Sequence, residues 1–89
     1  MLETTISVMP VHGGWAVRPD HHEATHFLNG GRAEAHARRL GEAAWRTGSA
    51  ALVRVHDLHG RIVAAWRFGP EADGALWWPK ARAADPKRD

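Results

Sequence analysis

The sequence contains no cysteine among its 89 residues, and this absence excludes several classes of function. Without thiols there is no disulfide framework, no thiolate zinc site, no iron–sulfur cluster and no cysteine nucleophile. Serine is limited to Ser7 and Ser49, and no Gly-rich loop precedes a Lys-Ser or Lys-Thr pair. No apolar run approaches the roughly 20 residues of a membrane-spanning helix. We therefore expect no enzyme and no membrane protein, and the lack of cysteine and of a secretory signal favours the cytoplasm.

Charge of one sign is not in large excess either. Lysine and arginine total 12 against 10 acidic residues, so the formal net charge is +2. This excess is small for a protein held to phosphates mainly by charge. The segment 70–89 is rich in proline and in charges of both signs, and it contains both lysines. We expect a single domain over 1–69, followed by a C-terminal extension over 70–89 that is partly disordered.

Short segments in which apolar and polar residues alternate are typical of strands. Four such segments predict two hairpins, 4–9 with 15–18 and 51–56 with 61–68. Gly13 and Gly14 lie near the first turn, and Gly60 suits a positive φ angle in the second. Segment 24–28 is a candidate for a further short strand.

A helix is predicted over 32–47, where one face carries alanine and leucine at helical spacing: Ala33, Ala37, Leu40 and Ala44. Asn29 is a suitable N-cap, and Gly48 is placed to end the helix. The expected fold class is α+β. It comprises a small antiparallel sheet of four strands, or five if 24–28 is a strand, in the order β-β-(β)-α-β-β with one helix packed on one face.

The order and spacing of several short motifs are similar to those of a known family. These motifs are Gly13-Gly14-Trp15-Ala16-Val17, Ala24-Thr25-His26-Phe27, Ala37-Arg38, Gly48, Val55-His56-Asp57 and Gly60-Arg61-Ile62. Over about 6–68 the chain resembles the small bacterial family known as domain of unknown function 2188. The resemblance implies a small α+β fold and supplies no activity and no catalytic residues. The chain departs from the family's pattern at Asn29-Gly30-Gly31, where a polar cap and acidic residues are usual, and in its extension after Gly69.

Five tryptophans are the most unusual feature of the composition. Strand parity predicts a set of residues that face the helix: Trp15, Val17, Ile62, Ala64, Trp66 and Phe68. Together with Trp45 in the helix, Trp15 and Trp66 are expected to fill a core that otherwise consists largely of alanine. Trp77 and Trp78 are adjacent, so they cannot both face one core from an extended chain. Either the extension docks one ring, or the pair contacts another subunit or partner.

The other face of the sheet is predicted to stay uncovered, and four arginines are assigned to it by parity: Arg18, Arg54, Arg61 and Arg67. Such a face can be merely solvated, can form a homodimer or other protein contact, or can hold nucleic acid. We expect a non-enzymatic binding or assembly module that self-associates or contacts a protein through this face or through Trp77 and Trp78. The alternative is weak nucleic-acid binding through the arginines, with no cofactor in either case.

Histidine provides a further, less favoured alternative. His21, His22 and His26 are close in sequence, as are His56 and His59, and neutral imidazole is a ligand for zinc, copper or nickel. Residues four apart on a strand lie some 13 Å apart, however, which argues against a preformed metal site. We expect no metal, and solvent-exposed loop histidines instead.

Overall fold

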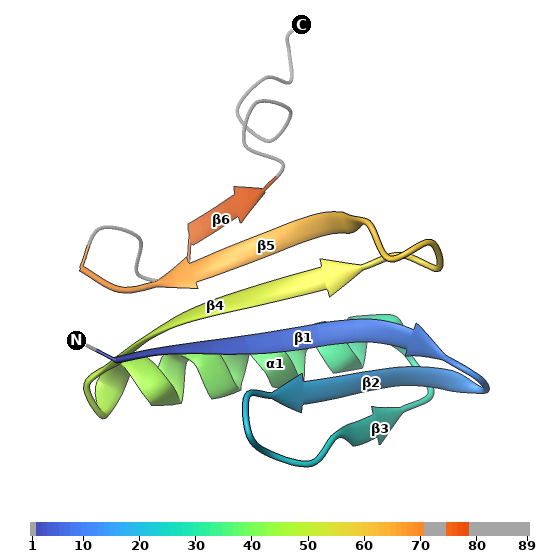
Figure 1. Ribbon diagram of the computed structural model, residues 1–89, viewed down its shortest axis with the longest axis horizontal. Coiled ribbons are helices and arrows are strands. Elements are labelled where there is room, and N and C mark those ends of the chain that lie inside the picture. The colour runs from blue at the N-terminus through green and yellow to red at the C-terminus, as the bar shows by residue number, and fades with distance from the viewer. Residues whose placement is uncertain (1, 71–74, 79–89) are drawn as a thin grey trace, which may run out of the picture.

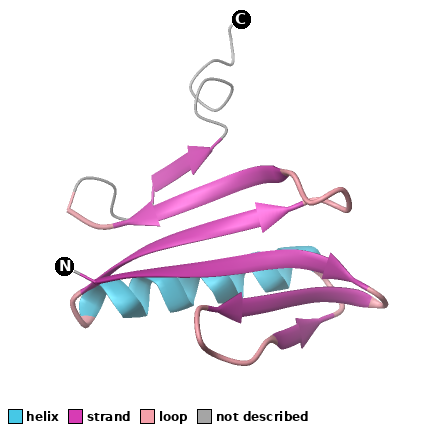
Figure 2. Cartoon of the chain, in the orientation of Figure 1, coloured by secondary structure: helices cyan, strands magenta, loops and turns pink. Residues whose placement is uncertain are grey.

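The computed structural model describes residues 2–70 and 75–78, and it shows one helix packed against one face of a single sheet (Figure 1). The elements in chain order are β1 Leu2–Val11, β2 Gly14–Pro19, β3 Thr25–Phe27, α1 Gly30–Arg46, β4 Ser49–His56, β5 Ile62–Phe68 and β6 Ala75–Trp78 (Figure 2). This arrangement confirms the α+β class with one helix on one sheet face. Within the described residues, no helix has the length and apolar character required to cross a membrane.

The sheet is mixed and has six strands in the order β3-β2-β1-β4-β5-β6, so the prediction of a purely antiparallel sheet of four or five strands is wrong. β1 and β4 pair in parallel, with Val8 opposite Val55. The physical reason is the helix, because a helical crossover returns the chain so that the next strand runs in the direction of the strand before it. β3 runs in the direction of β1 after two antiparallel pairings, and β4 therefore does so too.

β6 lies within the predicted extension and adds to the sheet beside β5. Residues 71–74 and 79–89 lie outside the described part of the chain. The prediction that 70–89 is partly disordered concerns mainly these residues and stays a prediction.

The two ends of α1 agree with the predicted capping residues. The Asn29 side-chain oxygen accepts a hydrogen bond from the Arg32 amide at 3.0 Å, which confirms Asn29 as the N-cap. The helix begins at Gly30, two residues before the predicted start. Gly48 follows the helix with a φ angle of +98°, a conformation that glycine adopts without strain. The loop glycine Gly60 also has a positive φ angle, as predicted.

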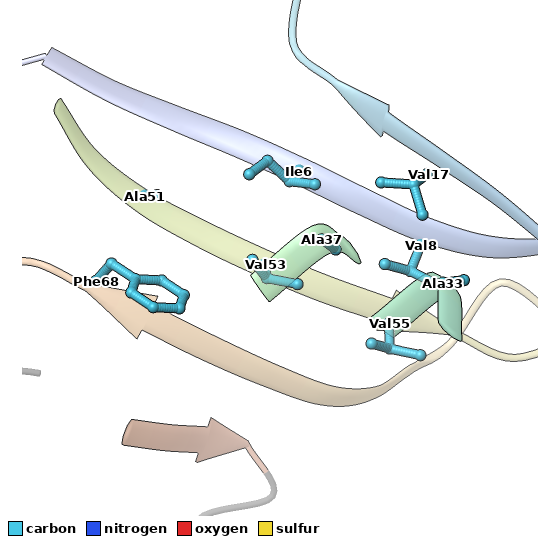
Figure 3. Packing of buried hydrophobic residues seen from close by; sticks show 9 residues of the cluster. All are labelled: Ile6, Val8, Val17, Ala33, Ala37, Ala51, Val53, Val55 and Phe68. Atoms are coloured by element: carbon cyan, nitrogen blue, oxygen red, sulfur yellow. The ribbon is translucent and has the colours of Figure 1, made fainter. Parts of the chain in front are cut away.

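The core lies between α1 and the sheet (Figure 3). Its buried residues are Ile6, Val8, Val17, Ala33, Ala37, Ala51, Val53, Val55 and Phe68. Trp15, Trp45 and Trp66 pack against this cluster, which confirms that these rings fill the space left by small helix residues. Ile62 is 36% exposed, so its predicted inward position is wrong. The register of β4 with β5 shifts next to Val55, and beyond that irregularity Ile62 no longer follows the alternation of its strand.

Candidate functional site: the open sheet face

α1 lies behind the sheet in Figure 1, and the opposite face of the sheet is turned toward the viewer. We call this opposite side the open face and define it by the residues that alternate with the core residues of β1, β2, β4 and β5: Glu3, Thr5, Ser7, Met9, Ala16, Arg18, Ala50, Leu52, Arg54, Ala65 and Arg67. Ala16 and Ala65 are buried although they belong to this face. The open face therefore has a small apolar floor with polar and basic side chains above it.

Strand pairing brings Arg18 and Arg54 to either side of Ser7. Ser7 of β1 pairs with Arg18 of β2 and also with Arg54 of β4. Arg54 in turn pairs with Ala65 of β5. Because neighbouring strands are about 4.8 Å apart, the two arginine backbones are separated by roughly 10 Å, well within the combined reach of their side chains. We call these four positions, Arg18, Ser7, Arg54 and Ala65, the arginine row.

A second row lies one step toward the start of β1. Thr5 pairs with Leu52, and Leu52 pairs with Arg67. Arg67 is exposed and Leu52 is half-buried. Ser7 and Thr5 are not among the site residues predicted from the sequence. Their neighbours across the sheet depend on the parallel pairing of β1 with β4, which the sequence analysis does not predict. The alternation of 4–9 was the only available signal for them.

Arg54 has an unsatisfied polar atom within the arginine row. Its Nε is buried and has no hydrogen-bond partner in the described part of the chain, although the residue as a whole is only half-buried. A buried donor without an acceptor costs about 1–3 kcal/mol, so such atoms are rare in folded proteins. An acceptor supplied from outside the chain would remove this cost.

Arg61 does not join the other predicted arginines. It precedes β5 and belongs to the loop after β4, where its Nε donates to Asp57 Oδ2 at 3.3 Å. Its backbone amide also donates to Asp57 Oδ1 at 3.0 Å, and the His59 amide donates to the same oxygen at 2.8 Å. The Arg61 amide is the largest cause of the lowered pKa of Asp57. Desolvation, the second-largest effect, opposes it, and the His59 amide and the charges of Arg61 and His59 lower the pKa further. Arg61 therefore holds the loop together.

Trp77 and Trp78 lie at the end of β6, and the backbone of Trp78 pairs with Ala65. The prediction that one ring docks or contacts a partner concerns side chains outside the described part of the structure.

The histidines are spread over several elements. His21 and His22 lie in the turn between β2 and β3, and His26 lies in β3 and is exposed. His56 ends β4, and its Nδ1 is 3.4 Å from the Gly60 carbonyl oxygen. Among residues 2–70 and 75–78, no three histidine or acidic side chains are grouped so that they could hold a metal ion.

A depression of about 610 Å³ lies where the two hairpin turns meet the loop that precedes α1. Its walls include Pro10, Trp15, Leu28 and Leu58. Leu28 is 90% exposed and Leu58 is 84% exposed, so this end of the molecule is markedly apolar. The only acidic group in its wall is Asp57, whose oxygens already accept hydrogen bonds within the loop.

Comparisons with protein-family models, with curated proteins and with solved structures return no match to this chain. The resemblance to domain of unknown function 2188 therefore stays a prediction.

Proposed function

We propose that this chain is a non-enzymatic, cytoplasmic binding domain that holds nucleic acid by its phosphates on the open face. The observation that carries the proposal is the arginine row, in which two arginines flank one serine and one of them retains a buried, unpartnered Nε. Guanidinium groups bind phosphate through paired hydrogen bonds, which lysine cannot form. The four positions of the row contain no acidic residue, so no carboxylate within it competes for these groups.

The same charge pattern disfavours the open face as a homodimer contact. A two-fold interface places one surface patch against a second copy of itself. Such a contact would bring the three arginines Arg18, Arg54 and Arg67 of one copy against those of its partner, and like charges at an interface are unfavourable. An anionic partner meets the same face with charge of the opposite sign.

The expected mode of binding is weak and independent of base sequence. Readers of single strands stack bases on aromatic rings, and the open-face residues of β1, β2, β4 and β5 include no phenylalanine or tryptophan. Three arginines that neutralise three phosphates predict a slope of log affinity against log salt of about −2 for a single strand and about −3 for a duplex. Dissociation constants of about 10⁻⁴ to 10⁻⁶ M are typical of such binding at physiological salt.

Fluorescence anisotropy with labelled 12-nucleotide single-stranded and duplex probes tests the proposal. The variant R18Q/R54Q/R67Q should lose at least about tenfold in affinity, since three charge-assisted contacts disappear while the apolar stems are kept. The matched control is R32Q/R39Q/R46Q, which removes the same charge from exposed positions of α1. Equal losses in the two variants, or binding to polyglutamate and not to either oligonucleotide, would contradict the proposal.

Contact with a protein is the second candidate function, and the apolar end of the molecule favours it. Leu28 and Leu58 are almost fully exposed beside the depression, and large exposed apolar groups commonly mark protein contacts. β6, with Trp77 and Trp78, forms one edge of the sheet. Sedimentation from about 10 µM to 1 mM tests self-association by either surface. A monomer throughout that range excludes a homodimer, and dissociation of a dimer by L28K or W77K would locate the contact.

A further inference from the structure

We infer that Arg18, Ser7 and Arg54 form a discrete binding site for a single oxyanion, of the phosphate monoester or diester class. The inference rests on the proposed function for its biological meaning, because this site would receive one phosphate of the nucleic acid. It can nevertheless be tested with an inorganic ion. The other arginine of the open face, Arg67, belongs to the neighbouring row and is not part of the site.

Strand pairing places the three residues side by side on one face of the sheet. Ser7 pairs with Arg18 on one side and with Arg54 on the other, so the three residues belong to the same face of the sheet, with the serine between the two arginines. Paired residues on adjacent strands lie about 4.5–5.5 Å apart, and an arginine side chain is long enough to reach across its neighbour. β1 and β4 are central strands, and a rigid strand positions a side chain better than a loop does.

The unpartnered Nε of Arg54 indicates that the site lacks a hydrogen-bond acceptor. Its Nε lacks an acceptor, and Nε with one terminal nitrogen forms the fork that receives two oxygens of a phosphate. Because Nε is buried in the free protein, the guanidinium has to turn toward Ser7 for this fork to meet the ion. The ion supplies the acceptor to Nε, the Ser7 hydroxyl donates to a third oxygen, and exposed Arg18 neutralises the remaining charge from the opposite side.

The site is tested by titrating the full chain with sodium phosphate at constant ionic strength. The arginine Nε–Hε signals are monitored by NMR during the titration. The Arg54 signal should move with saturation, because a hydrogen bond forms at an atom that had none. Half-saturation is expected at about 1 mM, which is the scale of a few charge-assisted contacts in water. The Arg46 signal serves as the internal control, since Arg46 already pairs with Glu42 at 2.9 Å on the exposed side of α1.

The variants S7A and R18Q should each weaken phosphate binding at least about threefold, while T5A, which alters the adjacent hydroxyl of the same strand face, should leave it unchanged. Equal, non-saturating shifts of Arg54 and Arg46 would mean an adventitious ion only and would overturn the inference. Oligonucleotide binding without the Arg54 response would overturn the site and leave the proposed function standing. Phosphate binding without oligonucleotide binding would overturn the proposed function and leave the oxyanion site standing.

Discussion

Arg54 of β4 lies directly opposite Ala65 of β5 on the open face, and only Arg54 carries a buried polar atom that lacks a hydrogen-bond partner. Ala65 is completely buried among its neighbours, whereas Arg54 places its Nε out of contact with water without giving it an acceptor. A face that served only to be solvated would gain nothing from this arrangement. The unpartnered Nε of Arg54 is therefore the observation on which the proposed anion site depends.

Arg54→Met should raise the free energy of unfolding by about 1 kcal/mol. The substitution removes the unsatisfied Nε and keeps an apolar side chain of similar length over the buried floor. Urea unfolding measures the effect, with Arg18→Met as the control at an exposed position, where we expect a change within about 0.5 kcal/mol. A loss of more than about 1 kcal/mol in Arg54→Met would show that the guanidinium stabilises the free protein.

Gly41→Ala should destabilise the fold by about 1–2 kcal/mol, even though alanine is the better helix former. A Cβ at Gly41 would lie 2.7 Å from Cε1 of the Phe68 ring and 3.3 Å from Cγ2 of Val53, both of which are buried. Thermal unfolding measures the loss. In the background of Phe68→Leu the same substitution should cost less, because the crowded ring atom is gone, and equal costs in both backgrounds would rule out this contact as the cause.

Asn29→Ala should cost about 1 kcal/mol, since the Arg32 amide loses its acceptor at the helix start. Asn29→Asp should instead stabilise the protein by about 0.3–1 kcal/mol at neutral pH and low salt, because the first turn of α1 contains no acidic residue to complement the helix dipole. Chemical denaturation at low and high salt measures both effects. The gain from aspartate should shrink at high salt, and a gain independent of salt would exclude an electrostatic origin.

Asp57→Asn should make the free energy of unfolding depend less steeply on pH in the acidic range. The pKa of Asp57 is lowered from its ordinary value of 3.8, chiefly by the Arg61 amide, so the carboxylate stabilises the folded state above that value. This contribution is lost as the pH falls through the lowered pKa, and asparagine has no charge to lose. Unfolding measured at a series of acidic pH values gives the comparison. Parallel curves for the two proteins would show that the loop contacts do not favour the charged form of Asp57.

Local features of the fold were predictable from the sequence because short-range chemistry determines them. The cap at Asn29, the glycine at Gly48 and the inward tryptophans Trp15 and Trp66 follow from spacing within one element. The parallel pairing of β1 with β4 was missed because it depends on treating 24–28 as a true strand, which in β3 is three residues long. Once that strand is accepted, the helical crossover sets the direction of β4.

The candidate site was predictable only in part for the same reason. Parity placed Arg18, Arg54 and Arg67 on the open face, and it did so correctly for each strand taken alone. It could not show that Ser7 lies between two of them, which requires the register between strands distant in sequence. It also placed Arg61 on the face, whereas the irregularity in register near Val55 and the contacts with Asp57 keep that residue in the loop.

The most direct test of the account is to map which side of the molecule meets nucleic acid. Backbone amide shifts of the full chain should be followed by NMR during titration with a 12-nucleotide single strand. We predict that the largest changes fall at Ser7, Arg18, Arg54 and Arg67, and that added salt reverses them. Changes centred on the exposed side of α1, or on the apolar end around Leu28 and Leu58, would contradict the assignment of the open face as the binding surface.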